Sequence, residues 1–336
     1  MVGHDIIVVG ASAGGVEALQ GLLRGLPADL PAAVFVVLHL SAEAPSLLPQ
    51  ILNRAGPLPA AAAVDNERIV PGRVYVAVPD RHLLIERGRV CLVRGPKENR
   101  ARPSVDPLFR SAARDYGSRV IGVVLTGALD DGTSGLQAIK ARGGLAVVQD
   151  PAEALYAGMP GSAVENVAVD YCMPLTEIPA LLARLAVEPA PDGAAYPLPP
   201  NLDLEVRIAE MDMDPLDKGE VPGTPSVFAC PECHGTLWEI QDGNLLRFRC
   251  RVGHAYSAES MLAEHDEGLE AALWSALRAL EESTALAKRM AASARERHHP
   301  LLVTRYEQKA HAQEQHAWLI REMLSSDKRV KQDQPA

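Results

Sequence analysis

The sequence predicts an α/β fold, a three-layer α/β/α sandwich built on a mainly parallel, Rossmann-like sheet, followed by a small cysteine-rich module and a C-terminal helical hairpin. Three observations support this fold class. Up to about Leu185, short continuous apolar runs typical of buried parallel strands alternate with segments of helical periodicity. Three cysteines then cluster between residues 230 and 250, and apolar residues recur at helical spacing from Ala258 onward. Alternating strands and helices form parallel sheets covered by helices on both faces.

The first strand and helix set the pattern of the sheet. Ile6 to Val9 form an apolar run, and apolar residues recur at helical spacing from Val16 to Leu26. Further strands are expected at residues 33–40, 73–78, 83–85, 90–93, 119–126 and 145–148, with 83–85 and 90–93 joined as a hairpin. Further helices are expected at residues 46–55, from about 103 to 116, at 133–142, around 158–160 and at 174–185.

Changes in composition divide the chain into five parts. The predicted boundaries are a first domain at 1–188, a Pro-rich acidic linker at 189–226, the cysteine-rich module at 227–257, the helical hairpin at 258–325 and a disordered tail at 326–336. The linker is expected to be semi-extended rather than packed, apart from a short element at 204–211. Pro300, directly after His298 and His299, is expected to separate the two helices of the hairpin.

Composition and charge exclude several classes of protein. The formal net charge of -10 argues against nucleic-acid binding, and an aromatic content of 4 % argues against stacking on bases. No apolar run approaches the roughly 20 residues that a membrane span needs, and the N-terminus lacks the features of a signal peptide. We therefore expect a cytoplasmic protein without direct membrane insertion, in which clustered cysteines favour a metal over disulfides.

A candidate nucleophile, Ser12, lies where the first strand ends. Glycines at 10, 14 and 15 would permit a sharp strand-to-helix turn that presents the Ser12 hydroxyl at the positive end of the next helix. The same turn could bind a phosphate or be purely structural. A dinucleotide fingerprint G-x-G-x-x-G does not fit, because serine occupies the position of the second glycine.

A base and a carboxylate pair are expected at the same edge of the sheet. Ligands of open α/β sheets bind beyond the carboxyl ends of the strands, where His39, Asp130 and Asp131 follow apolar strands. Singly, a histidine here is more often a core residue, and the two aspartates are more often turn or N-cap residues. Together with Ser12 they supply the nucleophile, base and orienting carboxylate that acyl transfer needs, which favours a catalytic site.

Six stretches resemble the chemotaxis protein-glutamate methylesterase family (CheB type), in order and over about residues 4–186. They are GASAGG at 10–15, VVLHL at 36–40, PGRVYVAVPDRHL at 71–83, RPSVDPLFRSAA at 102–113, LTGALDDGTSG at 125–135 and QDPAEALYAGMPGSA at 149–163. The resemblance implies cofactor-free hydrolysis of glutamate γ-methyl esters on chemoreceptors or receptor-like signalling proteins, with release of methanol. It leaves room for glutamine deamidation as well.

The resemblance also implies the role of each site residue. Ser12 is expected to be the nucleophile, His39 the general base and Asp131 the orienting carboxylate, with Asp130 the weaker choice. The oxyanion hole is expected to consist of the backbone N–H groups of Ala13 and Ala128.

Two residues depart from the family's pattern, and one domain of that pattern is not expected here. Ala13 stands where threonine is usual, and Leu129 takes a glycine position in the loop before the aspartate. The family's fuller pattern has an N-terminal receiver domain, whereas the catalytic strand of this chain begins at Asp5. We therefore expect constitutive activity or control by another module.

A second site is expected in the cysteine-rich module. Cys230, Cys233, Cys250 and His254 give C-x2-C, a sixteen-residue spacer and C-x3-H, a spacing typical of small zinc sites. Three thiolates and one imidazole make a closed set, so we expect a structural zinc in a zinc-ribbon-like module too small to fold alone. The alternative is a chance cluster of reduced cysteines. On the zinc interpretation, metal removal would unfold this module and leave esterase activity largely intact.

A different function class remains open at this stage. Arg247, Arg249 and Arg251 alternate along one predicted strand, where they could face phosphate or an acidic protein, and we expect a partner protein at the C-terminal module. The predicted hairpin offers an apolar stripe for docking or self-association. The chain could therefore be a regulatory protein-binding module of a signalling pathway, with hydrolysis incidental or lost.

Overall fold

The chain forms two compact units, Met1–Met261 and Leu262–Ala336. The computed structural model describes residues 3–42, 46–212 and 214–332. The first unit contains the sandwich and the cysteine-rich module together, and the second consists of helix alone.

The central sheet of the first unit is entirely parallel and has seven strands in the order β3-β4-β2-β1-β7-β8-β9. Its strands are β1 (Ile6–Ala11), β2 (Ala33–Leu38), β3 (Ala60–Ala62), β4 (Val74–Val76), β7 (Val120–Val124), β8 (Leu145–Gln149) and β9 (Tyr171–Met173). This confirms the predicted parallel sandwich. The short edge strands β3 and β9 were missed, because three residues of mixed burial carry no clear periodicity.

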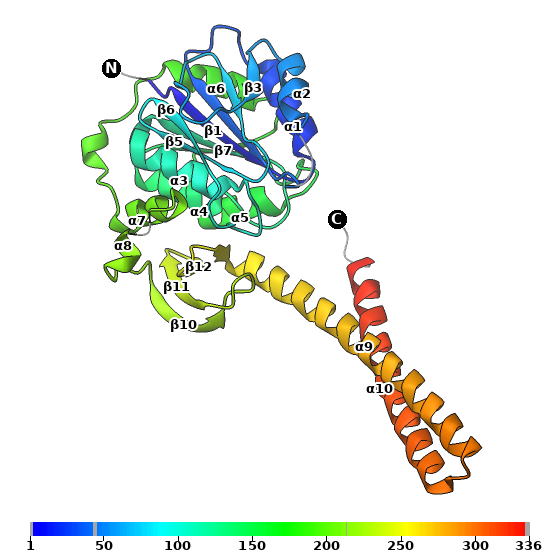
Figure 1. The fold of residues 1–336 in the computed structure, drawn as a ribbon. Coiled ribbons are helices and arrows are strands. Elements are labelled where there is room, and N and C mark those ends of the chain that lie inside the picture. Colours follow the sequence, from blue (N-terminus) through cyan, green and yellow to red (C-terminus); the bar gives the residue numbers. More distant parts are fainter. Residues whose placement is uncertain (1–2, 43–45, 213, 333–336) are drawn as a thin grey trace. The chain divides into compact units, whose positions relative to one another are not determined.

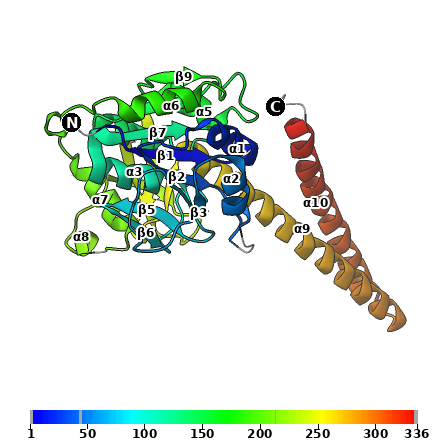
Figure 2. The same ribbon diagram turned by 90° about the horizontal axis from the view of Figure 1, so that it is seen from above.

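Helices cover both faces of the sheet, as Figures 1 and 2 show. On β1, Ile7 and Val9 pack in one core with α1 (Gly15–Gly25), α2 (Leu48–Ala55) and α6 (Ile178–Val187). Ile6 and Val8 face the opposite core, which contains α3 (Val105–Tyr116), α4 (Thr133–Ala141) and α5 (Gly158–Asn166). Alternate residues of a strand face opposite sides, so a continuous apolar run feeds two cores at once.

Two further elements pack against the second core. The predicted hairpin is present as β5 (His82–Glu86) and β6 (Arg89–Val93), which pair antiparallel. Helix α7 (Pro200–Ala209) buries Leu202 and Val206 in the same core. The linker expected at 189–226 thus contains a packed helix: α7 overlaps the short element expected at 204–211 and begins four residues earlier, because its apolar side chains complete the α3 face. The short elements η1 (Gly117–Arg119), η2 (Gly193–Ala195) and α8 (Asp214–Asp217) complete this region.

The cysteine-rich module is a four-stranded antiparallel sheet, here called the ribbon. Its strands are β10 (Thr224–Ala229), β11 (Thr236–Asp242), β12 (Leu245–Cys250) and β13 (Ala255–Ser257). Leu237, Phe248 and Tyr256 form a small core with the cysteines and Met261. The ribbon lies in the same compact unit as the sandwich.

The remaining chain forms two long helices, α9 (Ala258–Glu296) and α10 (Pro300–Gln332). Leu277, Ala317 and Leu324 pack between them, and Lys288 pairs with Glu314 at 2.5 Å. The predicted break before Pro300 is present, but α10 continues to Gln332, so a disordered tail does not begin at residue 326. The final four residues of that predicted tail lie outside the described residues. No helix in the described ranges is long and apolar enough to cross a membrane.

Candidate active site and metal site

Ser12 occupies a tight turn between the end of β1 and the start of α1. Its N–H donates to the Thr126 carbonyl at 3.0 Å, and its own carbonyl accepts from the Gly15 N–H at 2.9 Å. Gly14 lies between them with φ of 71°, a left-handed conformation that glycine adopts without strain. The turn therefore fixes the Ser12 backbone at the carboxyl edge of the sheet.

A chain of two hydrogen bonds joins Ser12, His39 and Asp131. His39 Nδ1 lies 2.9 Å from Ser12 Oγ, and His39 Nε2 lies 2.7 Å from Asp131 Oδ2. Because an ionised carboxylate only accepts, the proton of the neutral imidazole sits on Nε2. Nδ1 is then left with a lone pair that accepts the serine O–H, the arrangement in which imidazole can remove the hydroxyl proton.

The carboxylate of Asp131 is buried and heavily hydrogen-bonded. It accepts from Ser104 Oγ at 2.9 Å, from the Val105 N–H at 2.7 Å and from Asn99 Nδ2 at 2.9 Å. Burial opposes its ionisation, but the bond to His39 and these donors prevail and lower its pKa to about 2. Asp131 is therefore an anion at neutral pH, held in one orientation.

The neighbouring Asp130 points to a different partner. It accepts from Ser257 Oγ at 2.6 Å, and burial raises its pKa to about 7. Of the two aspartates that the sequence placed in this loop, only Asp131 is hydrogen-bonded to His39 among the described residues.

A third buried carboxylate, Asp106, lies behind Asp131. It accepts from Asn99 Nδ2 at 2.8 Å and from the Gly135 N–H at 2.7 Å. Burial and then the charge of Asp131 raise its pKa to about 7. A single Asn99 amide group thus donates to two carboxylates, one of which bonds to His39.

The two backbone groups expected to form an oxyanion hole belong to Ala13, directly after Ser12 in the turn, and to Ala128, in the loop between β7 and α4. Ala128 borders a cavity of about 480 Å³ that Ser12, His39 and Asp131 also line. Within the described ranges, no acceptor is bonded to the N–H of Ala13 or of Ala128. Leu129 has φ of 59°, so this leucine adopts a left-handed conformation that glycine would take without strain.

No role was predicted for Asn99 or Ser104, two of the residues that donate hydrogen bonds to Asp131. Ser104 lies beside the backbone donor Val105 in the stretch RPSVDPLFRSAA, which resembles the family. That resemblance was the one sequence feature that could have indicated a role for Ser104 in the site. Asn99 lies outside any predicted element, and nothing in its local sequence distinguishes it from a turn residue.

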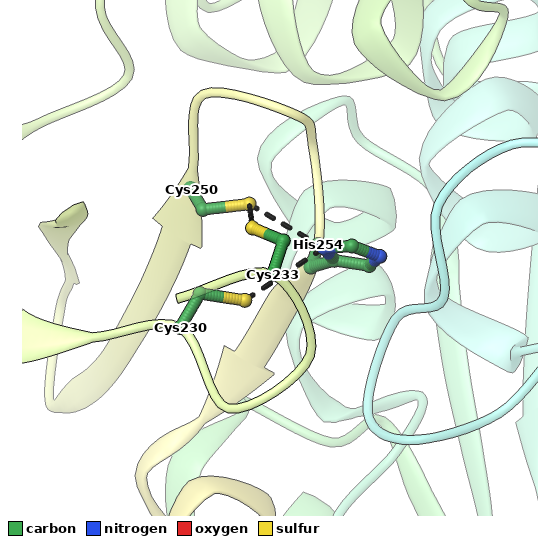
Figure 3. Close-up of side chains that lie close together, drawn as sticks. All are labelled: Cys230, Cys233, Cys250 and His254. Carbon is green, nitrogen blue, oxygen red and sulfur yellow. Dashed lines mark hydrogen bonds between the residues drawn. The ribbon is translucent and has the colours of Figure 1, made fainter. Parts of the chain in front are cut away.

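The four predicted metal ligands meet in the ribbon and point toward one another (Figure 3). Cys233 Sγ lies 3.6 Å from Cys250 Sγ, and His254 Nδ1 lies 3.6 Å from Cys250 Sγ and 3.7 Å from Cys230 Sγ. Zn–S bonds of about 2.3 Å in a tetrahedron place sulfurs about 3.8 Å apart. The donor set and its spacing therefore fit a closed four-ligand zinc site.

The arginines of β12 do not face an outside partner. Arg247 donates to Glu205 at 2.7 Å, and Arg249 donates to Glu98 and Glu205 at 3.0 Å each. Both arginines are buried. The expectation that they would be presented to phosphate or to an acidic protein is wrong for these two, because acidic side chains of the sandwich and α7 already pair with them.

Comparison with known proteins places the sandwich in a family. A model described as CheB methylesterase matches residues 7–182. A relative from Leptospira interrogans (serovar copenhageni) with the provisional name protein-glutamate methylesterase/protein-glutamine glutaminase is 42 % identical over 183 residues, which are 54 % of this chain and 95 % of the relative. The protein-glutamate methylesterase/protein-glutamine glutaminase 2 of Anaeromyxobacter dehalogenans is 42 % identical over 54 % of this chain and 53 % of its own.

A solved structure agrees with this similarity. The crystal structure of the Thermotoga maritima CheB methylesterase catalytic domain matches with a TM-score of 0.52 and 36 % identity. The match covers 54 % of this chain and 98 % of that domain. These similarities concern the sandwich; the ribbon and the helical unit lie beyond residue 182, where the family match ends.

Proposed function

The chain belongs to the CheB methylesterase family, and on this premise we propose that Ser12, His39 and Asp131 form a catalytic triad that hydrolyses glutamate γ-methyl esters on a methylated receptor or receptor-like signalling protein. The observation that supports it best is the continuous hydrogen-bond chain from Ser12 Oγ through His39 to the buried Asp131. The donors around Asp131 keep its buried carboxylate ionised and in one orientation, and such an anion can stabilise an imidazolium.

In the first half of the proposed reaction, Ser12 is acylated. His39 Nδ1 takes the Ser12 proton while Oγ attacks the ester carbonyl carbon, and the imidazolium is stabilised by Asp131 through Nε2. The N–H groups of Ala13 and Ala128 would receive the negative oxygen of the tetrahedral intermediate. When the C–O bond to the methoxy group breaks, the imidazolium returns its proton and methanol leaves.

In the second half, water regenerates the enzyme. His39 removes a proton from water, the resulting hydroxide attacks the acyl carbon, and the bond to Ser12 Oγ breaks as that oxygen is protonated. The products are the glutamate carboxylate and free Ser12. The same steps applied to glutamine release ammonia in place of methanol, which would add the glutaminase activity named for the relatives.

Replacement of the nucleophile tests this proposal. Ser12→Ala should reduce methanol release from a methylated receptor fragment by about 10⁴-fold or more, because the acylation step is lost. The exposed Ser275, in helix α9 of the other unit, provides a matched Ser→Ala control that should retain full activity. Methanol release that persists unchanged in Ser12→Ala would exclude the proposed triad.

The ribbon is proposed to hold a structural zinc through Cys230, Cys233, Cys250 and His254. The support is the mutual spacing of the four donor atoms, all within 4.8 Å of one another. Purified full-length protein should contain one zinc per chain by elemental analysis. Cys233→Ser should lower that content, whereas Cys172→Ser, at an exposed cysteine outside the ribbon, should not.

A partner protein is proposed to dock on the helical unit rather than on the ribbon arginines. Leu269, Trp274, Trp318 and Leu319 are exposed on α9 and α10, whereas Arg247 and Arg249 are paired and buried. Trp318→Ala should weaken partner binding or self-association, measured by sedimentation, without changing methanol release.

A further inference from the structure

Asn99 lies in a strained two-residue turn next to the candidate active site. Glu98 and Ala101 exchange backbone hydrogen bonds at 3.2 and 3.0 Å, and the two residues between them have φ of 47° (Asn99) and 68° (Arg100). Such a turn prefers Asn-Gly, and a left-handed arginine costs about 1 kcal/mol. The turn therefore depends on outside contacts to hold it in place.

The ribbon supplies those contacts. The Asn99 N–H donates to the Ala255 carbonyl of β13 at 2.8 Å, and the Ala255 N–H donates to the Lys97 carbonyl at 3.3 Å. Lys97 Nζ also donates to Glu232 Oε1 at 2.7 Å, and Glu232 lies in the turn between Cys230 and Cys233. Strand β13 thus pairs with the chain leading into the turn.

The ribbon side also fixes which way the Asn99 amide faces. Its Oδ1 accepts from the Ser257 N–H at 3.0 Å and from Ser260 Oγ at 3.2 Å. Its Nδ2 donates to Asp106 and Asp131. A reversed amide would set oxygen against two carboxylates and N–H groups against an N–H donor, so only one orientation is satisfied.

A buried ion cluster anchors the ribbon on this surface. Arg249 bridges Glu98 of the turn and Glu205 of α7, while Arg110 of α3 pairs with the same Glu98. Arg249 and Arg110 are 0 % and 2 % exposed. Buried charges tolerate little displacement, because moving one leaves another unpaired in a low-dielectric environment.

We propose that the ribbon is a positioning element of the esterase active site, which acts by holding Asn99 so that its amide donates to Asp131. The inference rests on the proposed function. It opposes the expectation from sequence that the ribbon could unfold without loss of activity. Asn99 is a positioning residue in this scheme: it acts on the reaction through Asp131 and His39.

The first test replaces the amide with an isosteric group that lacks both N–H donors. Asn99→Asp should lower kcat by at least about 10-fold, because Asp131 loses a charge-assisted hydrogen bond and gains a neighbouring carboxyl group, with KM changed less than twofold. Asn66→Asp is the matched control, since Asn66 is also left-handed at φ of 64° but bonds to Arg89 away from the site. It should keep the wild-type kcat.

A milder variant covers the case in which Asn99→Asp fails to fold. Ser260→Ala removes one donor to the Asn99 oxygen and should lower kcat about threefold, and Ser226→Ala in β10 should not. The effects of Ser260→Ala and Asn99→Asp should be less than additive, because both act through the same amide.

A third test disrupts the ribbon itself in the full-length chain. In a Trp274→Phe, Trp318→Phe background, the remaining Trp238 of β11 reports ribbon unfolding by its fluorescence. Treatment with a zinc chelator should change this fluorescence and lower kcat together, and added zinc should restore both. Ribbon unfolding with an unchanged kcat would overturn the inference, as would a folded Asn99→Asp protein with wild-type kcat.

A covalent probe separates failure of this inference from failure of the proposed function. The rate of Ser12 labelling by a fluorophosphonate reports activation of the serine without a methylated substrate. Slow labelling in Asn99→Asp, with no methanol release from wild type, would retain the inference and reject the substrate. Normal labelling and normal methanol release in that variant would reject the inference and retain the substrate.

Discussion

At the residue scale, Gly127 is required because the loop passes too close to Ser12 for any side chain. A Cβ built there would lie 2.1 Å from Met159 Sδ and 2.9 Å from Ser12 Cβ. Gly127→Ala should lower the free energy of unfolding by about 2 kcal/mol and reduce methanol release by displacing Ser12. Urea unfolding and steady-state kinetics measure the two effects.

The control for this prediction lies in the adjacent helix. A Cβ at Gly161 of α5 meets no atom within 4 Å. Gly161→Ala should therefore raise the free energy of unfolding by about 0.5–1 kcal/mol, through helix propensity, and leave activity unchanged. If Gly127→Ala and Gly161→Ala changed stability and activity equally, the close approach of the loop to Ser12 would not be the reason that glycine is needed at position 127.

Asp130 predicts a pH dependence of stability. Burial raises its folded-state pKa to about 7 from an ordinary 3.8, so its contribution to stability is fully present below pH 4 and is lost as pH rises through 7. Asp130→Asn cannot ionise, so this loss of stability with rising pH should disappear, and the asparagine oxygen can still accept a hydrogen bond from Ser257. The variant should gain about 2–4 kcal/mol relative to wild type between pH 5 and pH 8, measured by urea unfolding. A difference that does not vary over this range would contradict the raised pKa.

Leu129 shows how a local departure from the family pattern is accommodated. Its φ of 59° lies in the left-handed region that glycine adopts without strain. The loop therefore keeps the backbone conformation that suits a glycine, at a cost of about 1 kcal/mol for leucine. Gly158 makes room for it, because a Cβ there would lie 2.8 Å from the Leu129 N.

At the element scale, a buried ion cluster holds the ribbon on the sandwich together with hydrogen bonds, and this cluster should be intolerant of losing one partner. Arg249→Ala leaves Glu98 and Glu205 with one fewer cation in a buried site and should cost about 3–5 kcal/mol. Arg251→Ala, two residues along but exposed, should cost less than about 1 kcal/mol. Urea denaturation at neutral pH compares them. Similar losses in both variants would mean that the cluster contributes little net stability.

Helix α7 illustrates why the segment after residue 188 was predicted to be a linker. Proline and acidic residues dominate the composition of this segment. Its apolar side chains are buried only when the helix packs against α3, so the segment alone shows no sign of a packed helix. Glu205 in α7 is buried because Arg247 and Arg249 of the ribbon neutralise it. A buried glutamate paired across 42 residues has no local signature.

At the scale of the whole molecule, the proposed catalytic machinery belongs to the unit Met1–Met261. A chain ending at Gly268, which keeps the first turns of α9 and removes the rest of the hairpin, should retain kcat within about twofold, because Ser257, Ser260 and Met261 are preserved. A chain ending before β10 should lose at least tenfold in kcat if the ribbon positions Asn99. Methanol release from both truncated chains, checked for folding by circular dichroism, is the measurement. Equal activity of the two would contradict the role given to the ribbon.

The sequence by itself determined the parallel sandwich, the hairpin of two long helices and the positions where Ser12, His39 and Asp131 follow strands. Apolar period and strand order are local properties, and the carboxyl ends of parallel strands meet at one edge. The four clustered Cys and His residues were equally visible, because ligand spacing in such sites is mostly short-range.

Only the tertiary structure decided what holds Asp131 and where the ribbon lies. Asn99 gains its place from Ala255, Ser257 and Ser260, more than 150 residues later in the chain. Hydrogen bonds and buried ion pairs between distant segments depend on the packed arrangement of both partners. No periodicity or spacing in one segment encodes them.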